Sequence, residues 1–257
     1  MTSISGYELV ASPCCRKIYG TPRYASINFS ASAYWTDGKR ENSLMPNDGG
    51  LRKCECGEFF TLRDCLKIGL NADEKAIFPE RVHPSELPHA IKSTISINVE
   101  IAARRAYWIF LNDEYRELYK AHREEEDLNR KILWVEKWEL ENPDRRSKLK
   151  KIFDKLLLRK KPAVPSTPNE PITFPTFQPT DVQMENMLHL VELIQANSEN
   201  FTKEYPVELA ELYRELGKYD EAKALLENVS TENQDFVTNL ILELCNERQS
   251  APVRYRY

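Results

Sequence analysis

The sequence predicts an α+β protein, in which a small antiparallel β unit is followed by a mainly α-helical region. Four observations support this fold class. Residues 24–29 alternate in side-chain size, residues 34–36 favour a pleated surface, and the Asp37-Gly38 dipeptide that follows is a strong hairpin turn. From about residue 91, apolar side chains recur at three- and four-residue spacing, as they do on one face of a helix.

The composition is that of a globular protein. Of the 257 residues, 41% are hydrophobic and 30% are charged. No apolar run approaches the roughly 18 residues that a membrane-spanning helix needs, which argues against an integral membrane protein. The N-terminal residues lack the basic start and apolar stretch of a signal peptide, so we expect a cytoplasmic protein. The formal net charge of −4 argues against a protein built mainly for nucleic acid.

Proline and charge divide the chain into segments. Six prolines fall within residues 162–180, and the loss of so many amide donors predicts an extended linker there. We therefore expect a β unit at 1–70, a helical middle region at 71–161, the linker at 162–180 and a second helical region at 181–257. Residues 144–161 carry nine basic and two acidic side chains, whereas residues 181–250 carry fifteen acidic and five basic ones, so these two segments would attract one another.

Four of the six cysteines form two close pairs. Cys14 and Cys15 precede the predicted hairpin, and Cys54 and Cys56 follow it. If the hairpin folds back, the four thiolates converge into the donor set that zinc prefers in structural sites, and Gly57 relieves backbone crowding directly after the second pair. Two other interpretations remain open: small apolar residues buried under the hairpin, or a redox dithiol formed by Cys54 and Cys56.

Residues 12–60 resemble the zinc-ribbon class, and more closely a group of bacterial proteins with a Trp-(Ser/Thr)-Asp-Gly turn and a Met-Pro segment between two CPxCG knuckles. Here the turn reads Trp35-Thr36-Asp37-Gly38 and the segment reads Met45-Pro46. The first knuckle has Ser12 in place of its first cysteine, and the second is shortened to Cys54-Glu55-Cys56-Gly57. The resemblance implies a structural Zn²⁺ site, because four cysteine ligands leave no open position for catalysis.

The remaining cysteines and two histidines receive simpler interpretations. Cys65 and Cys245 are isolated among apolar residues, so we expect them to be buried and to belong to no site. His83 and His89 are alternative ligands, although they lie far beyond Cys56 in the sequence.

Residues 209–226 predict a helical hairpin that breaks at Gly217. The segment resembles a tetratricopeptide repeat, with signature residues at Tyr213, Gly217, Tyr219, Ala222 and Leu226. Residues 182–198 and 232–247 are predicted to form flanking helices that cover the hairpin. The resemblance implies a peptide-binding groove, and the other interpretation is a purely structural hairpin.

Residues 146–161 predict an amphipathic helix with one apolar face and a strongly basic remainder. Its basic patch consists of Arg145, Arg146, Lys148, Lys150, Lys151 and Lys155. The ordinary interpretation is a core-facing helix with a solvated basic face. The functional interpretations are docking to the acidic C-terminal region, in this chain or in a partner, and binding to nucleic acid.

We expect no catalysis, because the sequence lacks a nucleophile with its base, an HExxH motif, a phosphate-binding glycine loop and a dinucleotide fingerprint. The function that the sequence predicts is a protein-interaction adaptor or scaffold without a small-molecule substrate. In this hypothesis its partners are other proteins, which bind at Tyr34, Trp35 and Asp37 of the turn and at Tyr213 and Tyr219 of the hairpin. The alternative is a nucleic-acid-binding regulator that uses the ribbon and the basic helix.

Overall fold

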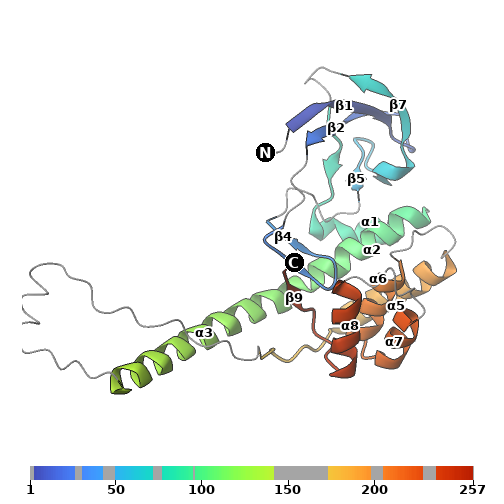
Figure 1. Ribbon diagram of the computed structural model, residues 1–257. Helices are drawn as coiled ribbons and strands as arrows, with labels where there is room; N and C mark the ends of the chain where they lie inside the picture. Colours follow the sequence, from blue (N-terminus) through green and yellow to red (C-terminus); the bar gives the residue numbers. More distant parts are fainter. Residues whose placement is uncertain are drawn as a thin grey trace, which may run out of the picture. The chain divides into compact units, whose positions relative to one another are not determined.

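The computed structural model confirms the α+β fold class, with small antiparallel sheets followed by a mainly helical region (Figure 1). It describes residues 3–26, 31–42, 50–71, 77–94, 96–141, 173–197, 205–227 and 236–256. The chain forms two compact units: Met1–Asp113 together with Phe177–Tyr257, and Glu114–Thr176. The segment boundaries expected at residues 70, 161 and 180 stay predictions.

The first sheet has the strand order β2-β1-β7 and is antiparallel throughout (Figure 1). Its strands are β1 (Ser3–Ala11), β2 (Ile18–Ser26) and β7 (Leu66–Asn71). Val10 lies opposite Tyr19, and both side chains are buried in a small core with Phe60. On the other face, which we call the outer face, Ile18 and Leu66 flank Ala11.

The second sheet, of order β4-β3-β9, contains the predicted hairpin. Its strands are β3 (Ala33–Trp35), β4 (Arg40–Glu41) and β9 (Arg254–Tyr255). Gly38 adopts a φ of 86°, in the left-handed region that glycine reaches without strain, and the Asp37 carboxylate accepts a hydrogen bond from the Lys39 amide at 3.1 Å. Strand β9 comes from the far end of the sequence and pairs directly with β3.

The third sheet, of order β6-β5-β8, lies against the first helices. It consists of β5 (Leu51–Lys53), β6 (Phe59–Thr61) and β8 (Glu80–Arg81), and short 3₁₀ turns follow at Leu62–Asp64 and Pro84–Glu86. Leu51 and Phe59 pack with buried residues of α1 (Leu87–Ser93) and α2 (Ile97–Leu111) in one apolar cluster.

The C-terminal region contains the predicted helical hairpin, formed by α6 (Tyr205–Glu215) and α7 (Tyr219–Glu227), and the flanking helices α5 (Asp181–Ala196) and α8 (Phe236–Asn246). Gly217 ends α6 with a φ of 74°, and the Lys218 amide donates to the Tyr213 carbonyl at 2.8 Å, as at a left-handed helix end. Ala222 and Leu226 of α7 are fully buried against α6 and α8. The expected hairpin and flanking helices are therefore present.

The second unit contains most of α3 (Asp113–Glu141). The described part of this helix runs to Glu141. Within this unit, the Phe174 ring stacks on Tyr119 with 6.1 Å between ring centroids, and His122 Nε2 lies 2.9 Å from Thr173 Oγ1. Among the described helices, none is both long enough and apolar enough to cross a membrane.

Candidate metal centre

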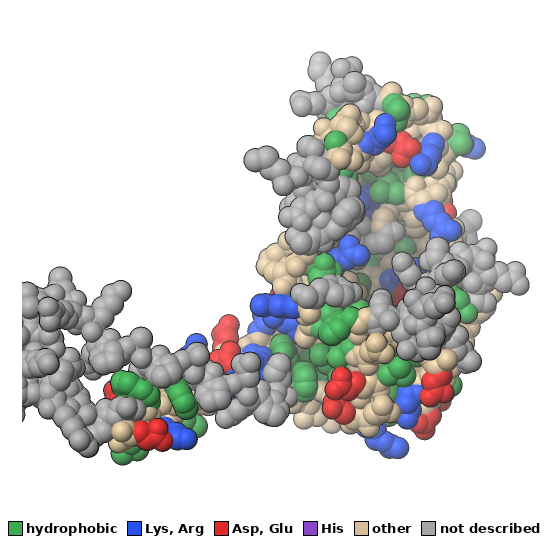
Figure 2. Space-filling model, in the orientation of Figure 1, with side chains coloured by type: hydrophobic (Ala, Val, Ile, Leu, Met, Phe, Trp, Pro, Cys, Tyr) green, Lys and Arg blue, Asp and Glu red, His purple; other side chains and the backbone are tan. Residues whose placement is uncertain are grey.

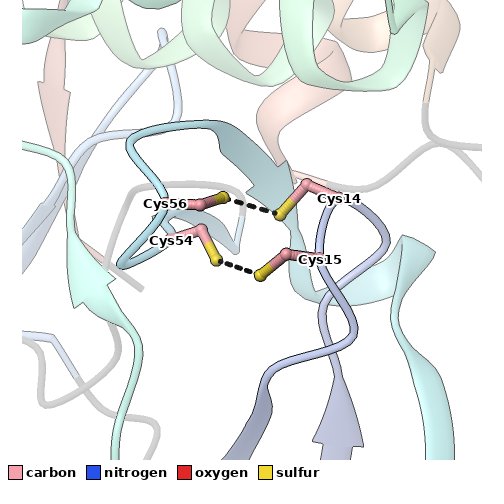
Figure 3. Close-up of side chains that lie close together, drawn as sticks. All are labelled: Cys14, Cys15, Cys54 and Cys56. Atoms are coloured by element: carbon pink, nitrogen blue, oxygen red, sulfur yellow. Dashed lines mark hydrogen bonds between the residues drawn. The ribbon is translucent and has the colours of Figure 1, made fainter.

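Two turns supply the four predicted ligands. The first turn follows β1, where the Ser12 amide donates to the Lys17 carbonyl at 2.9 Å. The second turn joins β5 to β6, where the Gly57 amide donates to the Cys54 carbonyl at 2.9 Å. Gly57 has a φ of 93°, so the backbone turns tightly after Cys56, and both cysteines of this second turn point toward the cysteines of the first turn (Figure 3).

The four sulfur atoms of Cys14, Cys15, Cys54 and Cys56 all lie within 4.8 Å of one another (Figure 3). The Sγ atoms of Cys14 and Cys56 are 3.5 Å apart, and those of Cys15 and Cys54 are 3.4 Å apart. A tetrahedral zinc centre with Zn–S bonds of about 2.3 Å places its sulfurs about 3.8 Å apart. The donor set therefore fits a metal ion such as zinc in number, chemistry and spacing.

Polar side chains support the cluster from its buried side. The Tyr19 hydroxyl lies 3.3 Å from Cys54 Sγ and accepts a hydrogen bond from the Glu55 amide at 3.0 Å. Ser12 Oγ lies 3.6 Å from Cys15 Sγ and 3.7 Å from Cys54 Sγ. Ser12 stands where a ribbon has its first cysteine, and it is fully buried next to two sulfurs. Cys14 provides the fourth sulfur of the cluster in its place.

The protein environment separates the acidities of the thiols. Burial opposes ionisation of Cys54, but hydrogen bonds from the Tyr19 hydroxyl, the Cys56 amide and neighbouring thiols outweigh it and lower the pKa of Cys54 to about 6. Burial raises the pKa of Cys14 to about 12, and the neighbouring Cys54 contributes to that shift. Thiolate is the metal-binding form of cysteine, so binding of a cation would favour ionisation of the whole group.

The remaining cysteines and the two histidines lie outside this cluster. His83 Nδ1 lies 2.8 Å from Ser85 Oγ, and the His89 ring packs edge-on against Phe59. Cys245 is buried in the apolar cluster around α6, α7 and α8, as expected, and Cys65 is half-buried. Within the described residues, the group that could hold a metal consists of the four predicted cysteines.

Trp35 and Asp37, two residues of the turn at which partners are predicted to bind, are buried in the structure. Trp35 is fully buried and its Nε1 donates to Glu41 at 2.9 Å, while Asp37 is 3% exposed and accepts a hydrogen bond from Asn112 Nδ2 at 2.9 Å. The physical reason is that β9 covers one side of the hairpin and the end of α2 reaches the turn. Tyr34 is half-buried and stacks on Tyr255.

The tyrosines predicted to bind partners on the helical hairpin are half-buried as well. The Tyr213 hydroxyl accepts a hydrogen bond from Gln195 Nε2 at 2.9 Å, and Lys218 Nζ lies 5.6 Å from the centre of its ring. The Tyr219 hydroxyl donates to the Arg248 carbonyl at 2.9 Å. Both hydroxyls therefore make hydrogen bonds within the chain.

Sequence reasoning missed a buried polar network that joins the turn to the C-terminal helices. Asn112 Nδ2 donates to Asp37 at 2.9 Å and to Glu215 Oε2 at 3.0 Å, and Trp108 Nε1 donates to Glu215 at 2.8 Å. Burial, together with the nearby charges of Glu211 and Asp37, raises the pKa of Glu215 well above its usual value.

Arg214 is the fully buried cation of this network. Its guanidinium donates twice to Glu211 and also reaches Thr36 Oγ1 and the Gln249 carbonyl. The three-residue spacing of Glu211 and Arg214 is a signal for an ion pair, but the same spacing is common on solvated helix faces.

The predicted basic patch, Arg145 to Lys155, lies outside the described residues, as does Met45-Pro46. Comparison of the chain with protein-family models, curated proteins and solved structures finds no match. The zinc-ribbon and tetratricopeptide likenesses therefore stay resemblances. The structure defines a four-cysteine cluster among small antiparallel sheets, followed by a helical region.

Proposed function

We propose that the protein is a non-enzymatic interaction scaffold whose N-terminal sheets are held together by a structural zinc ion. The main support for the zinc ion is that four sulfurs converge within 4.8 Å of one another from two turns that lie far apart in sequence. The core beneath these turns is small, since its buried members are Val10, Tyr19, Cys54 and Phe60. A metal that joins the turns adds stability that so few apolar contacts do not supply.

The outer face of the first sheet supports the scaffold part. Residues directly opposite one another point to the same face, so Ile18, Ala11 and Leu66 lie in a row across the sheet. Ile18 and Leu66 are 51% and 57% exposed, and Phe78, which packs edge-on against Tyr7 of β1, is 50% exposed. In the region of β1, β2 and β7, Figure 2 shows hydrophobic side chains interspersed with charged ones at the surface. Exposed apolar groups of this kind are typical of protein-binding surfaces.

Metal analysis tests the zinc centre. We expect about one zinc per wild-type chain when the protein is purified without chelator, and none in the Cys54→Ser, Cys56→Ser double variant. The matched control is Cys65→Ser, which removes a half-buried thiol outside the cluster and should keep its zinc. Hydrogen exchange should show lost protection around the two turns in the double variant. A metal-free wild-type chain, or a double variant that keeps its zinc, would refute the zinc centre.

Size-exclusion chromatography of native cell extracts tests the scaffold. We expect the chain in extracts of its own cell to elute within an assembly larger than the monomer. The double variant Ile18→Ser, Leu66→Ser should elute as a monomer with unchanged thermal stability, because both side chains are exposed. The control Leu133→Ser removes a more exposed leucine, 66% exposed, from α3 and should stay in the assembly. A wild-type chain that elutes as a monomer would refute this part.

A further inference from the structure

We propose that peroxide converts the four-cysteine cluster into two specific disulfides, Cys14–Cys56 and Cys15–Cys54, which expel the metal but keep the two turns joined. The proposal concerns regulation of the same site, and its metal-release half rests on the proposed zinc centre. The pairing itself depends only on the positions of the four sulfurs.

Geometry selects this pairing among the three that four cysteines allow. A bond between Cys14 and Cys15 is disfavoured, because Cα atoms of neighbouring residues across a trans peptide are about 3.8 Å apart, and disulfides usually need about 4.4–6.8 Å. This excludes the pairing that joins Cys14 to Cys15 and Cys54 to Cys56. Both remaining pairings cross between the turns.

All four sulfurs lie within 4.8 Å of one another, and the contacts of 3.4 and 3.5 Å favour one of the two cross-turn pairings. Cys14 Sγ faces Cys56 Sγ at 3.5 Å and Cys15 Sγ faces Cys54 Sγ at 3.4 Å (Figure 3). Each pair has to close by only about 1.4 Å to reach the S–S bond length. The redox pair that the sequence spacing suggests, Cys54 with Cys56, would instead join two cysteines of one turn.

The chemistry at each pair balances with one hydrogen peroxide. A thiolate attacks one peroxide oxygen and breaks the O–O bond, which gives a sulfenic acid and a hydroxide that is protonated to water. The partner sulfur then attacks the sulfenic sulfur, forms the S–S bond and expels the second oxygen as water after protonation. Each pair thus loses two electrons to peroxide. Because disulfide sulfur is neutral and a poor zinc ligand, Zn²⁺ leaves as the free ion after two peroxides have reacted.

Peroxide can reach both pairs. Cys14, Cys15 and Cys56 are exposed, whereas Cys54 is buried. Peroxide can therefore react with either sulfur of the Cys14–Cys56 pair. In the second pair, the exposed Cys15 reacts with peroxide and the buried Cys54 then attacks the resulting sulfenic acid.

The oxidised chain should be metal-free yet folded. The two bonds would join residues that are 42 and 39 positions apart, and both would link the turn after β1 to the turn between β5 and β6. They therefore replace the connection that the metal makes. A dithiol reductant should restore the thiols and the metal site together.

The test uses the full reduced chain with zinc, treated with two equivalents of hydrogen peroxide. We expect release of about one zinc per chain, measured with a colorimetric chelator, and cross-turn peptides whose fragmentation between Cys14 and Cys15 gives the proposed pairing. Cys65 and Cys245 should stay alkylatable after denaturation. Circular dichroism should show unchanged sheet content.

Two double variants compare the pairings under metal-free conditions. Cys14→Ser, Cys56→Ser keeps the contacting pair Cys15 and Cys54, whereas the matched Cys14→Ser, Cys54→Ser keeps Cys15 and Cys56. The first should form its disulfide at least tenfold faster. Equal rates, a Cys15–Cys56 bond in the wild-type chain, or sulfinic and sulfonic acids alone would overturn the inference while leaving zinc binding intact. Correct pairing in a chain that never binds zinc would instead refute the zinc centre and support the pairing.

Discussion

Replacing Arg214 by methionine tests whether the buried network holds the C-terminal hairpin to the rest of its unit. The Arg214 and Glu211 side chains are 0% and 1% exposed, and the guanidinium donates to both Glu211 oxygens, at 2.7 and 2.5 Å. Methionine keeps much of the apolar volume of arginine but removes every donor. The Glu211 carboxylate would then be buried without its cation.

The expected loss is large on the scale of a single substitution. Removing one partner of a buried ion pair costs about 3–5 kcal/mol, because the other charge is left uncompensated. Removing Glu211 as well should recover at least about 2 kcal/mol, since a pair replaced by apolar side chains is often near neutral. Recovery stays incomplete because the Gln249 carbonyl also loses its donor from Arg214.

Urea unfolding measures both effects, with the slope of the transition compared between variants. The control is Lys223→Met in the same hairpin, whose ion pair with Asp220 has side chains 30% and 86% exposed, and it should change the free energy of unfolding by less than about 0.5 kcal/mol. The reasoning fails if Arg214→Met costs less than about 1 kcal/mol, or if Glu211→Leu added to it restores nothing.

Three further predictions concern single side chains. Ser12→Ala removes a hydroxyl beside two sulfurs, so zinc affinity in a chelator competition should fall about 10- to 100-fold while the ion stays bound at saturation; unchanged affinity would contradict a supporting role for Ser12. Gly57→Ala places a Cβ on a backbone with a φ of 93° and should cost about 1–2 kcal/mol in thermal or urea unfolding, whereas no loss would mean that the turn can relax. Burial raises the pKa of Glu215, so the folded state binds this proton more tightly than the unfolded state does, and wild-type stability gains as pH falls through the folded pKa. Glu215→Gln lacks this gain. Its free energy of unfolding relative to wild type should therefore be highest near pH 8 and should fall toward pH 5 by at most about 1.4 kcal/mol per pH unit. A difference from wild type in urea unfolding that is the same at every pH would contradict the assignment.

Local chemistry made much of the candidate site predictable from sequence. Close cysteine pairs on either side of an Asp37-Gly38 turn converge if the intervening chain folds back, and the structure brings their sulfurs together. Gly38 and Gly217 both adopt the left-handed conformation that the predicted turn and helix break require. The two glycine conformations depend on a few neighbouring residues, so the local sequence is sufficient evidence for them, whereas the convergence of the cysteines also requires the intervening chain to fold back.

The burial of the turn was not predictable in this way. Thr36 Oγ1 accepts a hydrogen bond from the Val253 amide at 3.0 Å, across 217 positions of sequence, and Asp37 meets Asn112 across 75. An aromatic residue before a polar turn is equally compatible with an exposed docking loop and with a buried one. Only the tertiary contacts of β9 and α2 decide between them, and no periodicity in the sequence encodes which distant segment covers a hairpin.

The two polar centres of this unit have different physical roles. The cysteine cluster joins turns whose shared core has few buried members, so its removal should loosen the sheets around Cys14 and Cys54. The β3–β4 hairpin depends instead on β9, on the Arg254 pair with Glu41 at 2.8 Å and on the network around Arg214. Loss of metal should therefore leave the hairpin and the C-terminal helices folded, because none of those contacts passes through a cysteine ligand.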